Sequence, residues 1–94
     1  MEINEIEIPK GKFALLGGPK DEYGFSHCGT FDTLEETRAK RSWHISVAPS
    51  RAAMHARAIG ENLDHRTLID PEACLRYLGM SFVIYNDQKQ VVAD

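Results

Sequence analysis

The sequence predicts a small α+β domain, in which a mainly antiparallel sheet carries two or three helices packed on it. Three observations support this fold class. Strand-like and helix-like segments are interleaved along the 94 residues, without a regular repeat of strand and helix. Hydrophobic residues make up 43% of the chain, which is enough for one modest core. No repeat or low-complexity linker divides the sequence, so we expect residues 1–94 to form a single domain.

The first third of the chain is expected to contain strands. Residues 5–8 alternate glutamate with isoleucine, which is the period of a strand, and a turn at residues 9–12 follows. Residues 13–16 predict a second, more buried strand that pairs with the first as a hairpin. Residues 17–22 predict a loop rich in glycine and proline. Residues 23–31 fit either a glycine-interrupted strand or an ordered loop, and the sequence leaves both open.

A helix is expected to begin at Thr33. Thr33 and Glu36 have the spacing of a capping box, in which the two side chains bond to backbone N–H groups at the start of the helix. The acidic residues then lie near the positive end of the helix dipole, and Arg38, Lys40 and Arg41 lie near its negative end. This arrangement predicts a short helix that ends near Arg41, and it explains the three basic residues without any ligand.

The next five residues alternate in character and predict a strand over residues 43–47. Trp43, Ile45 and Val47 would lie on one face, with Trp43 in the core. His44 and Ser46 would lie on the other face. The bland interpretation of His44 is a half-buried strand histidine that bonds to a neighbour. The alternative is a residue that faces a ligand, and the sequence does not choose between them.

The second half predicts two helices and a terminal pair of strands. From Ser50, apolar residues recur at spacings of four, three and four, which predicts a helix that ends near residues 62–64. Its apolar face would consist of Ala52, Ala56, Ile59 and Leu63. Asp70 and Pro71 predict the start of a helix over residues 72–78 that is closed by Gly79. Residues 81–85 have the strongest β propensity of the chain, and residues 90–93 are expected to return as an edge strand.

Charge is unevenly distributed along the chain, although the formal net charge is only -3. Residues 1–36 hold three basic against eight acidic residues, residues 37–66 hold six against two, and residues 67–94 hold two against four. Either the basic residues pair with the acidic flanks and with solvent, or they form a patch for phosphate or another anion. The overall acidity argues against a duplex DNA partner.

Several classes of site lack their usual signatures. There is no Gly-Lys-Ser/Thr loop and no glycine fingerprint for nucleotides, so we expect no cofactor. Cys28 and Cys74 lie far apart, and the histidines lack ligand spacing, so neither a metal site nor a disulfide framework is expected. We also expect no membrane segment and no signal peptide, which favours a cytoplasmic location. For a phage protein or a delivered effector, that location would be the host cytoplasm.

One stretch resembles a known family. Residues 43–47, the alanine-rich segment after them and residues 79–85 are similar to part of the phosphothreonine lyases, bacterial type III secretion effectors that remove phosphate from host MAP kinases by β-elimination. The resemblance covers residues 41–85. It implies that His44 corresponds to the general acid and that Arg66 stands near a lysine that holds the phosphate. Ser42 occupies the position of the family's catalytic lysine base, so the resemblance implies a similar local layout more than the same reaction.

A second pattern consists of two H-x-S/T elements, His44-Ile45-Ser46 and His65-Arg66-Thr67. Paired elements of this kind form the active site of 2H phosphoesterases, where two histidines act as acid and base. The two elements here are only about twenty residues apart, and the second lies in a polar stretch. Together with the lyase resemblance, they define the enzyme alternative, a phosphate-handling enzyme that uses His44.

The favoured prediction is a non-enzymatic binding protein of the inhibitor or effector type. It would occupy a protein partner or sequester a phosphate-containing ligand through the basic centre, with a helix start after residue 47 as an anion seat. The expected ligand-binding residues are Arg41, His44, Ser46, Arg51, His55 and Arg66. The two terminal segments are expected to be edge strands, which allows a homodimer without selecting it over a monomer.

Overall fold

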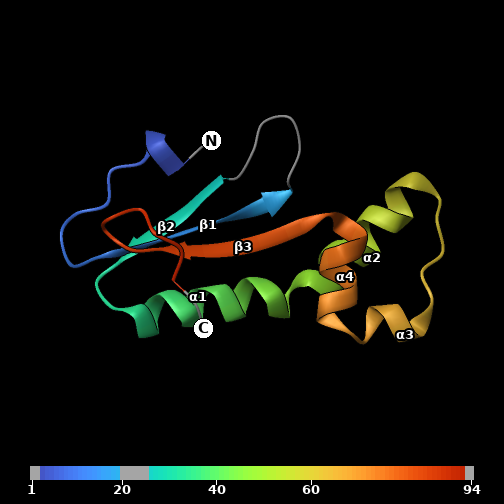
Figure 1. Ribbon diagram of the computed structural model, residues 1–94. Coiled ribbons are helices and arrows are strands. Elements are labelled where there is room, and N and C mark those ends of the chain that lie inside the picture. The colour runs from blue at the N-terminus through green and yellow to red at the C-terminus, as the bar shows by residue number, and fades with distance from the viewer. Residues whose placement is uncertain (1–2, 20–25, 93–94) are drawn as a thin grey trace.

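A sheet of three antiparallel strands lies at one end of the molecule, and a group of short helices extends beyond its other end (Figure 1). The computed structural model describes residues 3–19 and 26–92. Within these residues the strand order is β2-β1-β3. The elements are β1 (Phe13–Pro19), β2 (Ser26–Phe31), α1 (Leu34–Ser46), α2 (Ala48–Ile59), α3 (His65–Leu68), α4 (Pro71–Leu78) and β3 (Met80–Tyr85). The α+β class predicted from the sequence is confirmed.

The central strand β1 buries both of its faces. Leu15 pairs with Ile84 of β3, and Gly17 pairs with Phe82, so these four residues share the face toward α1. Ala14 and Leu16 point to the opposite face, where they pack against the N-terminal segment. Burial on both sides explains why β1 is an uninterrupted apolar run.

The N-terminal segment covers the second face of the sheet without joining it. A 3-10 turn, Ile3–Glu5, precedes an extended stretch in which Ile6 and Ile8 are buried while Glu5 and Glu7 are exposed. The prediction of a strand over residues 5–8 is therefore wrong, since these residues belong to no strand. The alternation that suggested it is nevertheless real, because it places the isoleucines on the sheet and the glutamates in solvent.

The β1–β2 hairpin differs from the predicted loop. β1 continues through Gly17 and Gly18 to Pro19, so the loop does not start at residue 17, and residues 20–25 lie outside the described part of the chain. β2 accounts for residues 26–31. The register shifts between Leu15 and Leu16, which face Gly29 and His27, so Cys28 is the extra residue of a β-bulge.

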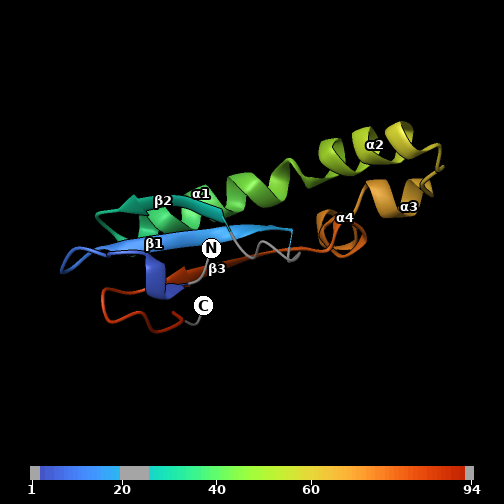
Figure 2. The same cartoon turned by 90° about the horizontal axis from the view of Figure 1, so that it is seen from above.

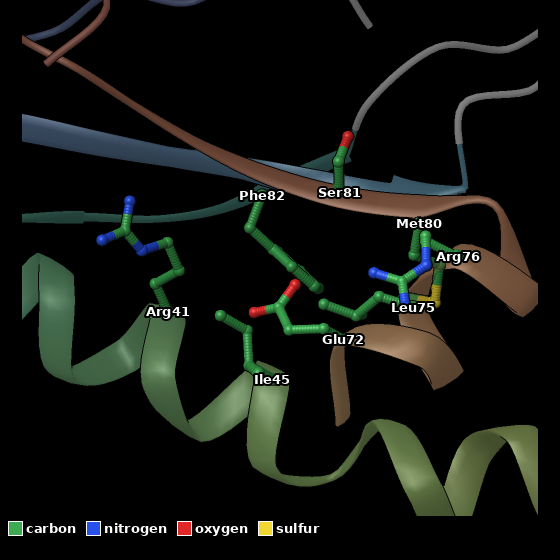
Figure 3. A pocket seen from close by; sticks show the side chains of 8 residues that line it. All are labelled: Arg41, Ile45, Glu72, Leu75, Arg76, Met80, Ser81 and Phe82. Carbon is green, nitrogen blue, oxygen red and sulfur yellow. The ribbon is translucent and has the colours of Figure 1, made fainter. Parts of the chain in front are cut away.

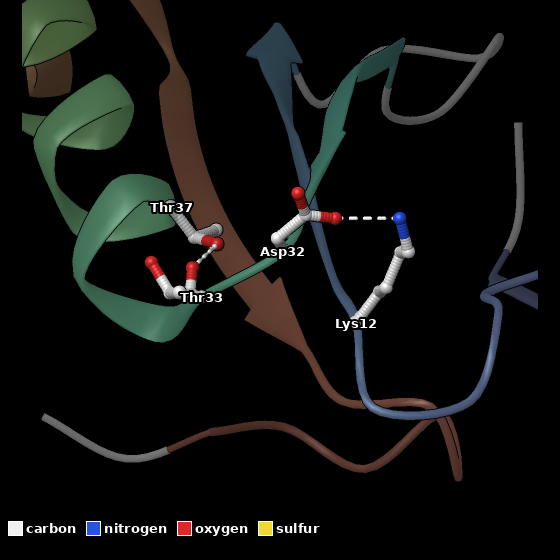
Figure 4. A network of polar contacts seen from close by, with 4 residues as sticks. All are labelled: Lys12, Asp32, Thr33 and Thr37. Carbon is white, nitrogen blue, oxygen red and sulfur yellow. Dashed lines mark hydrogen bonds and ion pairs between the residues drawn. The ribbon is translucent and has the colours of Figure 1, made fainter.

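Helix α1 begins where the sequence predicted and ends later. Thr33 Oγ1 accepts a hydrogen bond from the Glu36 backbone N–H at 3.1 Å, which is the predicted cap. The buried Thr37 donates its hydroxyl to the Thr33 carbonyl at 2.8 Å, and the Lys12–Asp32 ion pair lies just before this turn (Figure 4). The helix then continues through Ser46, so the predicted strand over residues 43–47 is wrong.

A single residue separates α1 from α2, and the two helices run almost end to end (Figure 2). Val47 has a nearly helical backbone, with φ −93° and ψ 0°; its N–H bonds to the Trp43 carbonyl, and its carbonyl accepts from the Arg51 N–H. Pro49 has no N–H to offer the carbonyl four residues earlier, which interrupts the hydrogen-bond ladder. The expected free helix start after residue 47 is instead a bend in a nearly continuous helix.

The helices beyond the sheet form a second core around alanines and a cysteine. Ala48, Ala52, Cys74 and Leu75 are buried together, and Leu63 packs against them. α2 ends at Ile59, earlier than predicted, because Gly60 adopts a left-handed conformation with φ 74° and caps it. Ile59 is 53% exposed, so its prediction as part of the apolar face is wrong. The residues between the two predicted helices contain the short helix α3.

The C-terminal elements follow the sequence closely. Asp70 accepts a hydrogen bond from the Glu72 N–H and Pro71 opens α4, while Gly79 closes it with φ 67°. After β3, the Asn86 side-chain oxygen accepts from the Gln88 and Gln90 N–H groups and holds the turn. The predicted return strand is reduced to one bridge between Val91 and Tyr85, and residues 93–94 lie outside the description.

Candidate functional site

Trp43, on α1, is the largest of the exposed hydrophobic side chains in the described part of the chain. Half of its surface, 50%, is accessible to solvent, so the prediction that it lies in the core is wrong. The Lys40 Nζ lies 4.4 Å from the centre of the indole ring, within the range of a cation–π interaction. Lys40 precedes Trp43 by three residues, which are neighbours on a helix surface and not on a strand.

Further side chains continue this surface across the bend. The backbone hydrogen bonds from Val47 to Trp43 and from Arg51 to Val47 stack these residues in successive turns. Met54, which is 70% exposed, lies one turn beyond Arg51. We call this group the Trp43 surface, and it consists of Lys40, Trp43, Val47, Arg51 and Met54. Neither Lys40 nor Arg51 forms an ion pair with the described residues.

His44 lies under this surface, between α1 and the sheet. Its ring stacks on Phe82 of β3, with ring centres 5.0 Å apart and an interplanar angle of 23°, and meets Trp43 edge to face at 4.9 Å. Both ring nitrogens are shielded from solvent and have no hydrogen-bond partner among the described residues. Burial lowers the pKa of His44, and the positive charges of Arg51 and Lys40 lower it further. The imidazole is therefore held in its neutral form.

Cys28 extends toward the same region from the bulge in β2. Burial raises the pKa of its thiol, while a hydrogen bond from the Gly17 backbone and the charges of Arg51 and Lys40 oppose that rise. The Cys28 thiol also donates to the Ser26 carbonyl at 3.7 Å. Because the pKa is raised on balance, the thiol stays protonated and is not an activated nucleophile. Cys74 is likewise a neutral thiol, since burial raises its pKa too.

The six residues predicted to bind a ligand do not line one pocket. His44 and Arg51 lie near each other, with Lys40 beside them. Arg41 lies on a different side of α1 from Lys40 and Trp43, and it lines a pocket at α4. The Ser46 hydroxyl donates to the Trp43 carbonyl at 2.6 Å, a helical back-bond next to the bend.

The remaining two predicted residues lie on other elements. The His55 ring meets Tyr77 of α4 edge to face, with ring centres 5.8 Å apart. The Tyr77 hydroxyl in turn donates to Glu61 at 2.7 Å, which raises the pKa of Tyr77. Arg66 is exposed on α3, where its backbone N–H bonds to the capping Asp64. These contacts give His55 a packing role and leave Arg66 outside both the Trp43 surface and the pocket.

The pocket between α1, α4 and β3 has a volume of about 320 Å³ (Figure 3). Its floor is apolar and consists of Ile45, Leu75, Met80 and Phe82. Charged side chains from α1 and α4 form its rim: Arg41, Glu72 and Arg76. Ser81 of β3 also lines the pocket, with its side chain directed away from it. Of these residues, only Arg41 was predicted from the sequence to bind a ligand. The available signal was the spacing of Glu72 and Arg76, which places both on one side of the predicted last helix.

Other kinds of site have no representative in the described part of the chain. No group of three or more histidine, cysteine, aspartate or glutamate side chains within residues 3–19 and 26–92 is arranged to hold a metal ion. Across the same residues, no helix has both the length and the apolar character needed to cross a membrane. No protein-family model matches the chain, and neither the curated proteins nor the solved structures include a significant match.

Proposed function

We propose that this chain is a non-enzymatic binding protein that occupies an anionic protein partner through the Trp43 surface. The observation that carries the proposal is the half-exposed indole of Trp43 with the Lys40 ammonium above it. Tryptophan is enriched among the residues that dominate protein interfaces, because its large ring fills a pocket on the partner and excludes water there.

The charge of the surface indicates the chemistry of the partner. Lys40 and Arg51 flank the apolar side chains, and they have no ion-pair partner in the described chain. A partner with carboxylates around an apolar depression would complement both features. Such complementarity raises the rate of association and makes it sensitive to salt.

The enzyme alternative would use His44 as a general acid or base. It requires that a ring nitrogen reach a substrate, whereas both nitrogens are shielded beneath Trp43 and beside Phe82. The stretch that resembles the phosphothreonine lyases is helical over residues 43–46 in this chain. A lyase or phosphoesterase activity that is lost in His44→Ala would support this alternative over partner binding.

The proposal is tested by native mass spectrometry of the chain with lysate of its source cell, followed by calorimetry with the identified partner. We expect Trp43→Ala to weaken binding by about 2 kcal/mol or more, as at an interface hot spot. Arg51→Gln should reduce the salt dependence of association. Ile69→Ala is the matched control, because Ile69 is 66% exposed but lies beyond α3, outside the Trp43 surface. Equal binding by Trp43→Ala and the wild type would rule out this surface.

A further inference from the structure

Two charged groups at the α4 pocket have no ion-pair partner among the described residues. Glu72 and Arg76 lie one turn apart, in the order that favours an ion pair along a helix. They nevertheless form no ion pair with each other or with any described residue. Ser81 also lines the pocket, but its side chain points away from the opening, to the other face of β3 (Figure 3). Glu72 and Arg76 therefore border one opening without an ion-pair partner among the described residues.

The apolar part of the pocket lies between these charges. Figure 3 shows the Glu72 carboxylate extending between Ile45 and Phe82, while the Arg76 guanidinium lies on the other side, near Met80 and Leu75. A carboxylate and a guanidinium thus stand at different points above one apolar floor. A ligand that satisfies both must carry a positive and a negative group, with an apolar body beside them.

We propose that this pocket binds a free α-amino acid with a large apolar side chain. The ammonium group would bond to the Glu72 carboxylate, and the carboxylate would bond to the Arg76 guanidinium, which offers a planar pair of donors. The side chain would pack on Leu75, Met80 and Phe82.

The size of the pocket supports a ligand of this class. Its volume of about 320 Å³ lies at the lower end of the usual range for small-molecule sites, which fits one amino acid better than a nucleotide. Inorganic phosphate alone would leave the Glu72 carboxylate unpaired next to a second negative charge. A hydrocarbon would leave both charged groups without partners.

This site does not depend on the proposed function. Residues 41 and 45 of α1 line the pocket, whereas residues 40 and 43 belong to the Trp43 surface, on a different side of the same helix. Trp43→Ala should therefore leave amino-acid binding unchanged. The two proposals fail separately, because one is tested with a protein partner and the other with small molecules.

The test is an NMR titration of the ¹⁵N-labelled wild-type chain with L-phenylalanine and L-leucine. We expect saturable shifts of the Leu75, Ser81 and Phe82 amide signals. Two analogues each keep one of the two charged groups of phenylalanine: 3-phenylpropionate lacks the ammonium, and phenethylamine lacks the carboxylate. Each should bind about tenfold more weakly or worse, since each loses one charge-assisted contact. A peptide with phenylalanine at its N-terminus lacks the free carboxylate of that residue, and one with phenylalanine at its C-terminus lacks the free ammonium. Both should bind more weakly than the free amino acid.

Charge-removing variants complete the test. Glu72→Gln removes the negative charge at nearly constant size, and Arg76→Gln removes the positive charge while leaving a polar side chain on the exposed side of α4. Each should weaken L-phenylalanine binding about tenfold or more. Arg57→Gln on α2 is the control, because Arg57 is exposed and lies outside this pocket. The proposal is overturned if neither amino acid shifts these signals, if 3-phenylpropionate binds as well as L-phenylalanine, or if inorganic phosphate alone produces the same shifts.

Discussion

At the residue scale, His44 buries two ring nitrogens that have no hydrogen-bond partner among the described residues. The imidazole stacks on Phe82, and Trp43 covers its edge. A buried polar atom without a hydrogen bond costs about 1–3 kcal/mol, which the packing of the rings has to offset. The neutral form is the one that this site tolerates, because burial disfavours the charged imidazole and Arg51 and Lys40 also repel a positive charge here.

The protonation of His44 gives the fold a pH dependence. The folded-state pKa of His44 is lowered, whereas the unfolded value is about 6.5. As the pH falls below about 6.5, the unfolded chain takes up a proton before the folded chain does, so the free energy of unfolding should decrease. His44→Phe should flatten this decrease in urea denaturation between neutral and mildly acid pH.

The matched control for this experiment is His65→Gln, which removes an exposed histidine from α3. This variant leaves the contacts of His44 with Phe82 and Trp43 in place, so the decrease that His44 causes should remain. At neutral pH, His44→Phe should be as stable as the wild type or more stable by about 1 kcal/mol, because it removes two unsatisfied polar atoms. A His44→Phe variant with undiminished acid sensitivity would contradict this account.

The packing between α1 and the sheet also depends on Gly17 of β1, which lies against the Phe82 ring. A Cβ at this position would lie 1.9 Å from the nearest carbon of the Phe82 ring, so the ring would have to move. We expect Gly17→Ala to lower the free energy of unfolding by about 1–3 kcal/mol, as overpacking of a core does. Thermal or urea unfolding measures the loss.

The double variant Gly17→Ala, Phe82→Leu separates this clash from other effects. A smaller side chain at position 82 should make room for the added methyl group, so the two changes should cost less together than the sum of their separate costs. Simple additivity of the two losses would show that the Phe82 ring is not the obstacle.

At the element scale, α1 shows how tertiary packing decides a local structure. Residues 43–47 alternate as a strand does, but in the structure they continue the helix that is capped at Thr33. Continuing the helix brings Thr37, His44 and Ala48 against the sheet and the second core. A strand-like alternation over five residues does not outweigh the packing that the continued helix allows. Local propensity does not show this packing, because it depends on distant residues.

The start of α1 is expected to depend on the Thr33 side chain. Thr33→Ala removes the acceptor for the Glu36 N–H while leaving the backbone acceptor for Thr37 in place. The variant should lose about 1 kcal/mol of unfolding free energy in urea titrations. Thr33→Ser, which retains a hydroxyl at the cap, should stay close to the wild type; a similar loss in both variants would show that the cap hydroxyl is not the cause.

The sequence predicted the start of α1 and both ends of α4 better than it predicted the site. Caps at Thr33, Asp70 and Gly79 are local signals, because each depends on residues two to four positions away. The Trp43 surface and the α4 pocket combine residues from several elements. Their composition followed from the bend at Pro49 and the position of β3 beside β1, and neither is encoded in a short window of sequence.

At the scale of the whole molecule, the chain is long and flat. Its extents are 45 × 27 × 17 Å, and its Cα radius of gyration is 14.5 Å, compared with about 12 Å for a compact domain of this length. One core lies between the N-terminal segment and the sheet, and the other lies between α2 and α4. The two cores are therefore built around separate parts of an elongated chain.

This shape predicts an uneven pattern of amide hydrogen exchange. β1 is hydrogen-bonded on both sides and covered on both faces, so its amides should exchange most slowly. α3 has four residues and none of them is buried, so its amides should exchange fastest among the helices. Exchange measured by NMR or mass spectrometry checks this order. Equal protection of α3 and β1 would contradict the division of the molecule into a stable sheet and a looser helical end.

The bend at Val47 has a consequence for how this chain tolerates change in length. The helical phase carries across the junction, so that Arg51 continues the side begun by Trp43 while Ala52 turns inward to the second core. Each added residue would rotate everything after it by about 100°. One insertion at this point would therefore turn Arg51 and Met54 away from Trp43 and, in the same step, expose Ala52. Substitutions can adjust the two features separately, but the number of residues between Trp43 and Ala52 is fixed by both at once.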